Sequence, residues 1–214
     1  MAAAKERAVR RWDSCGRAWI AVLRHVWTAG EAGMDDRGAI IEGPPIVFEV
    51  TSLTWQDPIL REHGEDPDGG RHGAEGRGRP SAAAERECAR LRDLQGADQV
   101  RWVVDLLRAR PWTTSAWISL AVPCEPRDAA PCLVALSFRI RAYTLMMTAM
   151  FRAQNVYRGY LSYVPLREVQ LEVAEELGLP PGPMRVFVDV PYLRVADTER
   201  VARILTALPE PNAA

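Results

Sequence analysis

Residues 131–155 of the chain read PCLVALSFRIRAYTLMMTAMFRAQN. Two segments in it, 132–139 and 143–149, have the length and the apolar, branched side chains that are typical of strands. We expect a tight turn to join them, because only a few residues lie between the two segments. Such a hairpin would bring Arg152 back toward Cys132.

Further elements are predicted on both sides of this hairpin. Alternation and branching favour strands at 38–42, 46–50, 116–122 and 184–190. Apolar residues at helical spacing predict helices at 15–29, 82–94, 97–109, 166–177 and 198–205. In the first helix one face collects Trp19, Val22, Leu23, Val26 and Trp27, and Thr198 is the expected N-cap of the last helix. The order of helix, strands, helices, strands, helix, strand and helix predicts an α+β fold.

Length and composition fit a single globular domain over residues 1–214, with 48% hydrophobic and 26% charged residues. The polar N-terminus, Met-Ala-Ala-Ala-Lys-Glu-Arg, and the lack of a run of about 18 apolar residues favour a cytoplasmic protein over a secreted or membrane-inserted one. Residues 61–80 hold six of the 15 glycines and almost no apolar side chains, which predicts a flexible surface loop.

Charge and cysteine usage narrow the function classes. The formal net charge of −1 shows no electrostatic footprint for nucleic acid, so no nucleic-acid partner is expected. No C-x-x-C pair occurs among the four cysteines, and with three histidines no metal-ligand spacing is present. A lone cysteine in an apolar run is more often a small buried side chain than a nucleophile, but Cys132 stands at a strand end with Arg152 predicted nearby.

Short pieces of the chain match one known family in order and spacing. They are Ala18-Trp19, Asp36–Gly38, Arg90–Arg92, Asp98–Val100, Pro131–Leu133, Met147–Ala149 with Phe151-Arg152, Leu166–Gly178 and Tyr192. Over roughly residues 15–205 the sequence resembles the folate-dependent thymidylate synthases, particularly their short archaeal-type branch. The resemblance implies a mixed sheet with flanking helices, and a homodimer whose sheets pack back to back through an apolar face.

The resemblance also implies roles for individual residues. Cys132 matches the nucleophile that adds to C6 of a pyrimidine, after which C5 attacks the methylene carbon of 5,10-methylenetetrahydrofolate. Arg152 matches the arginine that contacts both this cysteine and the substrate phosphate, and its charge would lower the thiol pKa. Arg37 matches a second phosphate-binding arginine, on a mobile loop after the first helix. Tyr192 matches the tyrosine that binds the sugar.

Several positions depart from the family pattern. The two adjacent arginines that a partner subunit donates to the phosphate site are missing from the stretch 111–116. Asn155 stands where the family has an aspartate that contacts the pyrimidine, and an amide can both donate and accept. The asparagine that reads the ring edge aligns near Ser162 or Tyr163. Glu62 is the nearest candidate for the glutamate that organises water around the ring.

These departures leave more than one function open. The first hypothesis is a one-carbon transferase that adds a methyl or hydroxymethyl group to a pyrimidine or related ring, because Cys132 and Arg152 match the family while half of the phosphate-binding arginines are lost. Some relatives carry out such a transfer in antibiotic biosynthesis, which suggests a role in specialised metabolism. The second is an inactive family member that binds a ligand or a partner protein. A third, RNA binding through surface arginines, rests on charge alone.

Overall fold

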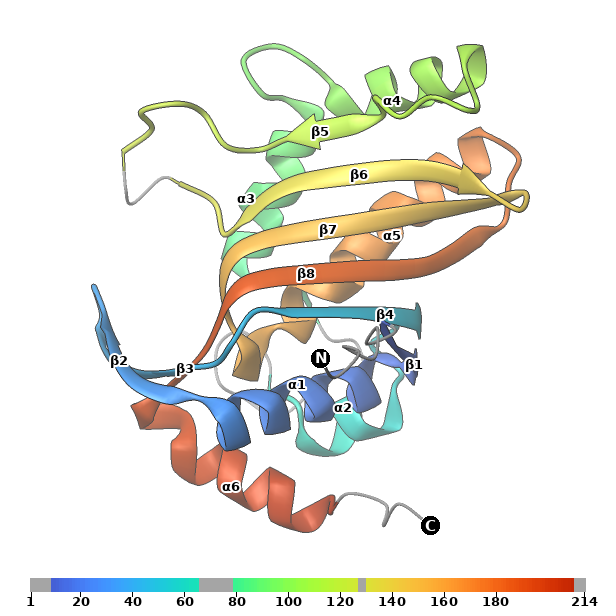
Figure 1. Ribbon diagram of the computed structural model, residues 1–214. Helices are drawn as coiled ribbons and strands as arrows, with labels where there is room; N and C mark the ends of the chain where they lie inside the picture. Colours follow the sequence, from blue (N-terminus) through green and yellow to red (C-terminus); the bar gives the residue numbers. More distant parts are fainter. Residues whose placement is uncertain (1–8, 66–78, 127–129, 210–214) are drawn as a thin grey trace, which may run out of the picture.

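The computed structural model describes residues 9–65, 79–126 and 130–209. Its described residues form a mixed eight-stranded sheet, which confirms the predicted α+β class (Figure 1). Six strands follow one another across the sheet: β1 (Arg10–Ser14), β4 (Ile46–Ser52), β8 (Pro181–Arg194), β7 (Thr144–Asn155), β6 (Leu133–Arg141) and β5 (Trp117–Ser119). Strands β2 (Glu31–Asp35) and β3 (Gly38–Glu42) form a hairpin, and β3 pairs antiparallel with the C-terminal end of β8.

The predicted hairpin lies at the centre of this sheet. Strands β6 and β7 pair antiparallel, and β7 then pairs parallel with β8. Ala142 and Tyr143 form the turn with φ values of 46° and 61°, the left-handed conformation that a two-residue hairpin loop of this kind requires. Tyr143 therefore lies in the turn and not in the strand, and β7 continues to Asn155 instead of ending at residue 149.

The helices cover one face of the sheet. They are α1 (Cys15–Ala29), α2 (Pro58–His63), α3 (Ala82–Arg92), α4 (Gln99–Ala109), α5 (Tyr160–Glu176) and α6 (Thr198–Ala207), with the short 3-10 helices η1 (Val156–Arg158) and η2 (Val195–Asp197). In Figure 1, α3 and α5 pass behind β6, β7 and β8. One contiguous core of buried apolar side chains fills the space between these layers. In the described part of the chain, no helix is both long and apolar enough to span a bilayer.

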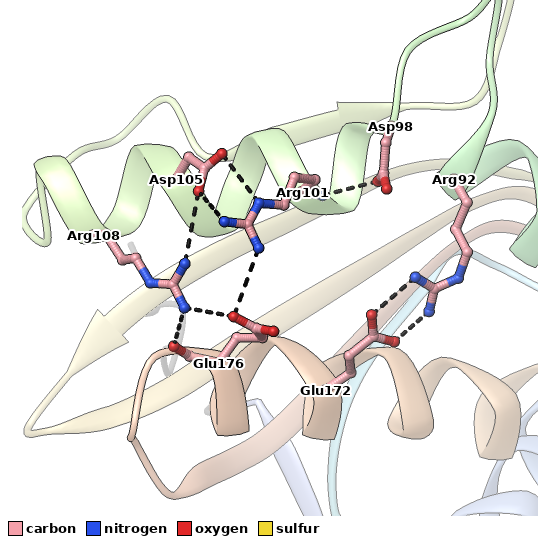
Figure 2. A network of polar contacts seen from close by, with 7 residues as sticks. All are labelled: Arg92, Asp98, Arg101, Asp105, Arg108, Glu172 and Glu176. Atoms are coloured by element: carbon pink, nitrogen blue, oxygen red, sulfur yellow. Dashed lines mark hydrogen bonds and ion pairs between the residues drawn. The ribbon is translucent and has the colours of Figure 1, made fainter.

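Ion pairs connect α4 and α3 with α5 at the surface. Figure 2 shows Arg101 and Arg108 of α4 reaching Glu176, and Arg92 of α3 reaching Glu172. All of these side chains are between two fifths and three fifths exposed, so solvent screens each pair and each contributes little to stability. The buried apolar stripe of α4 is therefore the main reason that this helix docks.

The structure corrects several sequence-based predictions. Trp27 is 41% exposed and so lies off the buried face of α1. The hydroxyl of Thr198 donates to the carbonyl of Val195 within η2 and makes no N-cap hydrogen bond. Helix α5 begins at Tyr160, six residues before the prediction, with Pro165 inside it. Strands β1 and β2 and helix α2 were not predicted, and α2 includes residues 61–63 of the expected loop, of which 66–78 lie outside the described residues.

The sheet face away from α5, here called the outer face, is less apolar than expected. Met146, Thr148 and Met150 of β7 are partly exposed on it. Glu49, only 4% exposed, lies between Arg11 at 2.7 Å and Arg185 at 2.6 Å on the two neighbouring strands. A buried carboxylate needs such paired cations, so the outer face combines methionines with a three-strand charge cluster.

Candidate active site

A cavity of about 480 Å³ opens where α3, β7, β8, α5 and the residue before β6 meet the β2–β3 turn. Five of the six site residues predicted from the sequence line it: Arg37, Cys132, Asn155, Ser162 and Tyr192. These residues are up to 155 positions apart along the chain. A volume of this size is within the usual range of small-molecule sites.

Cys132 lies immediately before β6, at the mouth of the cavity. Its carbonyl accepts from the backbone N–H of Arg152 at 3.0 Å, so the hairpin brings the two residues together as expected. The side chain of Glu87, from α3, reaches the same point: its Oε1 accepts from the N–H groups of Cys132 at 3.1 Å and of Leu133 at 3.0 Å. The thiol therefore sits beside a carboxylate as well as an arginine.

The local environment keeps the Cys132 thiol protonated in the free protein. Desolvation and the Glu87 carboxylate raise the pKa of Cys132, whereas Arg152 and Arg37 lower it, and the net shift is upward. Burial likewise raises the pKa of Glu87, which is only 6% exposed, although its two backbone hydrogen bonds oppose this. A buried carboxylate of raised pKa beside a thiol is a suitable acceptor for the thiol proton.

Arg152 does not line the cavity. Its Nε donates to the carbonyl of Pro131 at 2.9 Å and its Nη2 to that of Ala130 at 3.3 Å. The guanidinium thus braces the segment that leads into Cys132. It lowers the thiol pKa from this position, and contact with a substrate phosphate stays a prediction.

Cationic groups gather at the rim. Arg37 lies in the two-residue turn between β2 and β3, and its N–H donates to Asp35 at 2.8 Å. Arg194 pairs with the same carboxylate at 2.8 Å and lies 5.5 Å above the ring of Tyr192. Arg158 of η1 also lines the cavity. Arg158 and Arg194 are not among the residues predicted from the sequence, because arginines occur throughout the chain and nothing local distinguishes these two.

Two neutral lining residues have defined hydrogen-bonding roles. Burial raises the pKa of Tyr192, so its phenol remains protonated at neutral pH and can donate to a ligand. The Oδ1 of Asn155 accepts from the N–H of Tyr157 at 3.1 Å and caps η1. Asn155 therefore offers a ligand its NH₂ group, and its carbonyl is already used within the fold.

Glu62 does not belong to this cavity. It lies on α2 with 75% of its side chain exposed, and it lines a different hollow together with Glu65 and Arg200. The buried glutamate of the site is Glu87, which follows Ala84 and precedes Leu91 at the spacing of the buried stripe of α3. A glutamate on the apolar face of a helix is the signal that could have identified it from the sequence.

Two distantly related proteins are similar to the chain in sequence. Over 199 residues the chain is 25% identical to a protein of Methanococcoides burtonii named "Putative thymidylate synthase", covering 88% of this chain and 90% of that protein. Over 184 residues it is 24% identical to a protein of the same name from Methanosarcina mazei, covering 77% and 79%. No protein-family profile matches the chain. Among the described residues, no cluster of three or more potential metal ligands occurs.

Proposed function

We propose that this protein is a thymidylate-synthase-like transferase that moves a one-carbon unit from 5,10-methylenetetrahydrofolate to C5 of a pyrimidine or related ring. The observation that carries the proposal is the position of Cys132 in the same cavity as Glu87, Arg37 and Tyr192. The names of the two distant relatives point the same way.

The chemistry requires a thiolate only while a ligand is bound. Glu87 takes the proton of the Cys132 thiol, and the sulfur forms a bond to C6 of the ring. The C5–C6 double bond then supplies the electron pair that makes C5 nucleophilic. Glu87 is also our candidate for the water-organising role for which Glu62 was considered, since Glu87 is the buried carboxylate among the residues that line the cavity.

The lining also suits the one-carbon donor. Ala83, Phe151 and Leu161 provide an apolar wall for a flat ring, and Arg158 provides a cation for the carboxylates of a folate tail. Methylenetetrahydrofolate, when bound, supplies an electrophilic carbon at the formaldehyde oxidation level. Cys132 binds the acceptor ring covalently, and Glu87 accepts the thiol proton.

The acceptor is a pyrimidine or a related ring, with or without a phosphate. The family's two donated arginines are absent from residues 111–116, whereas Arg158 and Arg194 add cations to the same cavity. An altered set of cations on a retained nucleophile is expected when the reaction persists and recognition changes. A methyl or hydroxymethyl transfer in specialised metabolism, such as antibiotic biosynthesis, fits this pattern.

Exchange of the ring C5–H with deuterated buffer tests the proposal without the donor. Proton NMR would follow pyrimidine bases, nucleosides and 5′-monophosphates with the native protein and with Cys132→Ala. We expect exchange of at least one compound that depends on Cys132. Cys124→Ala is the matched control, because Cys124 is an exposed thiol that does not line the cavity. Exchange that survives in Cys132→Ala would refute the covalent step.

Two observations favour a second function. The raised pKa of Cys132 and the engagement of Arg152 by backbone carbonyls are both compatible with a site that binds a ligand and does no chemistry. In that case a compound from the same panel binds and its C5–H does not exchange. Retention of biological activity in Cys132→Ser would support this ligand-binding or interaction module.

The outer face is the proposed contact between two copies of the chain. It presents Met146, Met150 and Phe187 as partly exposed apolar side chains beside the Glu49 charge cluster. Light scattering should give twice the chain mass of 23.8 kDa. A mass of one chain at micromolar concentration would exclude the homodimer.

A further inference from the structure

The turn that carries Arg37 projects beyond the part of the hairpin that pairs with the sheet. Strand β3 pairs with β8 over three residues, and this ladder ends at Ile40 opposite Arg194. Figure 1 shows the β2–β3 hairpin continuing past the end of β8. Ile40 is buried, but Met34 is 75% exposed, so little apolar packing holds the outer part of the hairpin in place.

An ion pair from the last residue of β8 reaches this turn. Arg194 donates through Nη2 to Oδ2 of Asp35 at 2.8 Å and through Nη1 to Oδ1 at 3.4 Å. The two side chains are 22% and 28% exposed, so solvent screens this pair less than the pairs on α4 and α5. Asp35 Oδ1 also accepts from the N–H of Arg37 at 2.8 Å, so the same carboxylate fixes the turn itself.

The other contact of Arg194 is with the wall of the cavity. Its guanidinium lies 5.5 Å from the centroid of the Tyr192 ring, and Tyr192 lines the cavity. A guanidinium within about 6 Å of a ring centroid gains a cation–π attraction. Arg194 therefore connects the turn, through Asp35, to the cavity wall.

Arg37 and Arg194 differ in what their charges do. The guanidinium of Arg37 lines the cavity and has no ion-pair or hydrogen-bond partner among the described residues. The charged groups that act on the Cys132 thiol are Glu87, which raises its pKa, and Arg152 and Arg37, which lower it. Arg194 is not one of them. Any effect of Arg194 on the cysteine must therefore pass through the position of Arg37.

We infer that Arg194 and Asp35 are positioning residues: their ion pair holds the β2–β3 turn against the end of β8 and keeps the Arg37 guanidinium at the cavity that contains Cys132. This inference rests on the proposed function for the role of Cys132 as the nucleophile. It adds two residues that influence the reaction without contact with the reacting atoms.

Alkylation of Cys132 by iodoacetamide, followed as a function of pH in a Cys124→Ser background, tests this inference without a ligand. We expect Asp35→Asn to raise the pKa of Cys132 and to slow its alkylation at neutral pH by roughly two- to ten-fold. The direction is diagnostic, because loss of a negative charge would by itself lower the pKa of a nearby thiol. A rise in the pKa therefore reports the displacement of Arg37.

A double variant separates positioning from a direct effect of charge. Arg194→Met should slow alkylation as Asp35→Asn does. Arg37→Met/Arg194→Met should be no slower than Arg37→Met alone, because the effect of Arg194 passes through Arg37. Additive slowing would mean that Arg194 acts on the thiol through its own charge, and would overturn the inference.

Arg185→Met is the matched control on the same strand. Arg185 pairs with Glu49 at 2.6 Å and does not line the cavity. Its replacement should lower the melting temperature and leave the alkylation rate of Cys132 unchanged. Slowing of alkylation in this variant too would show a general effect of destabilisation and would contradict a positioning role for Arg194.

The outcomes separate this inference from the proposed function. Unchanged or faster alkylation in Asp35→Asn overturns the inference, and Cys132-dependent C5–H exchange by the native protein would then leave the transferase proposal standing. Slower alkylation in Asp35→Asn, together with no C5–H exchange by the native protein, would support the positioning of Arg37 and overturn the transferase proposal.

Discussion

Replacement of Glu87 separates its two roles at the site, that of a hydrogen-bond acceptor and that of a charge. Glu87→Gln keeps an oxygen for the N–H groups of Cys132 and Leu133 and removes the negative charge. Glu87→Ala removes both. We expect the first variant to fold at least as stably as the native protein at neutral pH, and the second to be clearly destabilised.

The magnitude follows from the two backbone donors. The N–H of Leu133 is buried and that of Cys132 is partly buried. A buried donor left unpaired costs about 1–3 kcal/mol, so the free energy of unfolding of Glu87→Ala should fall by about 2–4 kcal/mol. Burial raises the pKa of Glu87 above its ordinary value of 4.5, so the ionised form destabilises the fold. The contribution of protonated Glu87 to the free energy of unfolding is full below pH 4.5 and is lost as pH rises through the folded-state pKa.

Urea unfolding at pH 4 and at pH 7 measures both effects, and the stability gain of Glu87→Gln should appear only at the higher pH. The charge change should also lower the pKa of Cys132 and speed its alkylation, measured in a Cys124→Ser background to remove the exposed competing thiol. C5–H exchange should slow in the same variant, because the proton acceptor is gone. Equal destabilisation by glutamine and alanine, or slower alkylation of Cys132, would refute this reasoning.

Three further changes test the packing and charges. Gly159→Ala should lower the free energy of unfolding by about 1–3 kcal/mol, because the new Cβ would lie 2.9 Å from Tyr163 Oη. Urea unfolding measures this loss. Gly33→Ala is the control, because the atom nearest to its Cβ would be 3.4 Å away. Arg108→Ala should cost at most about 1 kcal/mol, and the loss should vanish in about 1 M salt; a larger, salt-independent loss contradicts the exposed-pair assignment. Glu49→Gln should cost about 1–3 kcal/mol at pH 7. Desolvation raises the pKa of Glu49, but its two arginine partners lower it by more, so the net shift is downward. The difference in free energy of unfolding between Glu49→Gln and the native protein should therefore shrink as pH falls below 4.5. A difference that does not change with pH would exclude this charge effect.

Elements with a strong local period were predicted well. Helix α1 has the predicted bounds, 15–29, and α4 differs from its prediction by two residues, because an amphipathic stripe is a property of the segment itself. Strand β1 was missed because its sequence, Arg-Arg-Trp-Asp-Ser, has no apolar alternation and forms a strand only by pairing with β4. Helix α5 was predicted too short: it begins six residues before the predicted start and contains Pro165, a residue that usually interrupts a helix.

Some features of the candidate site were likewise predictable from the local sequence, and others depend on tertiary packing. A hairpin is a local feature, so the sequence alone predicted that Cys132 and Arg152 come together. Asn155 and Tyr192 were predicted as site residues only from the resemblance to a known family. The tertiary structure alone decided that Glu87, 45 residues earlier, meets the cysteine.

Tertiary structure also decided that the Gln154 amide is buried without a full set of partners. Local patterns report which residues share the face of one element, since that depends only on spacing. Burial, the pairing of a polar atom and the pKa shifts that follow depend on which other elements pack against it. At this site those elements include helices α3 and α5, strands β7 and β8 and the β2–β3 turn, brought together from distant parts of the chain.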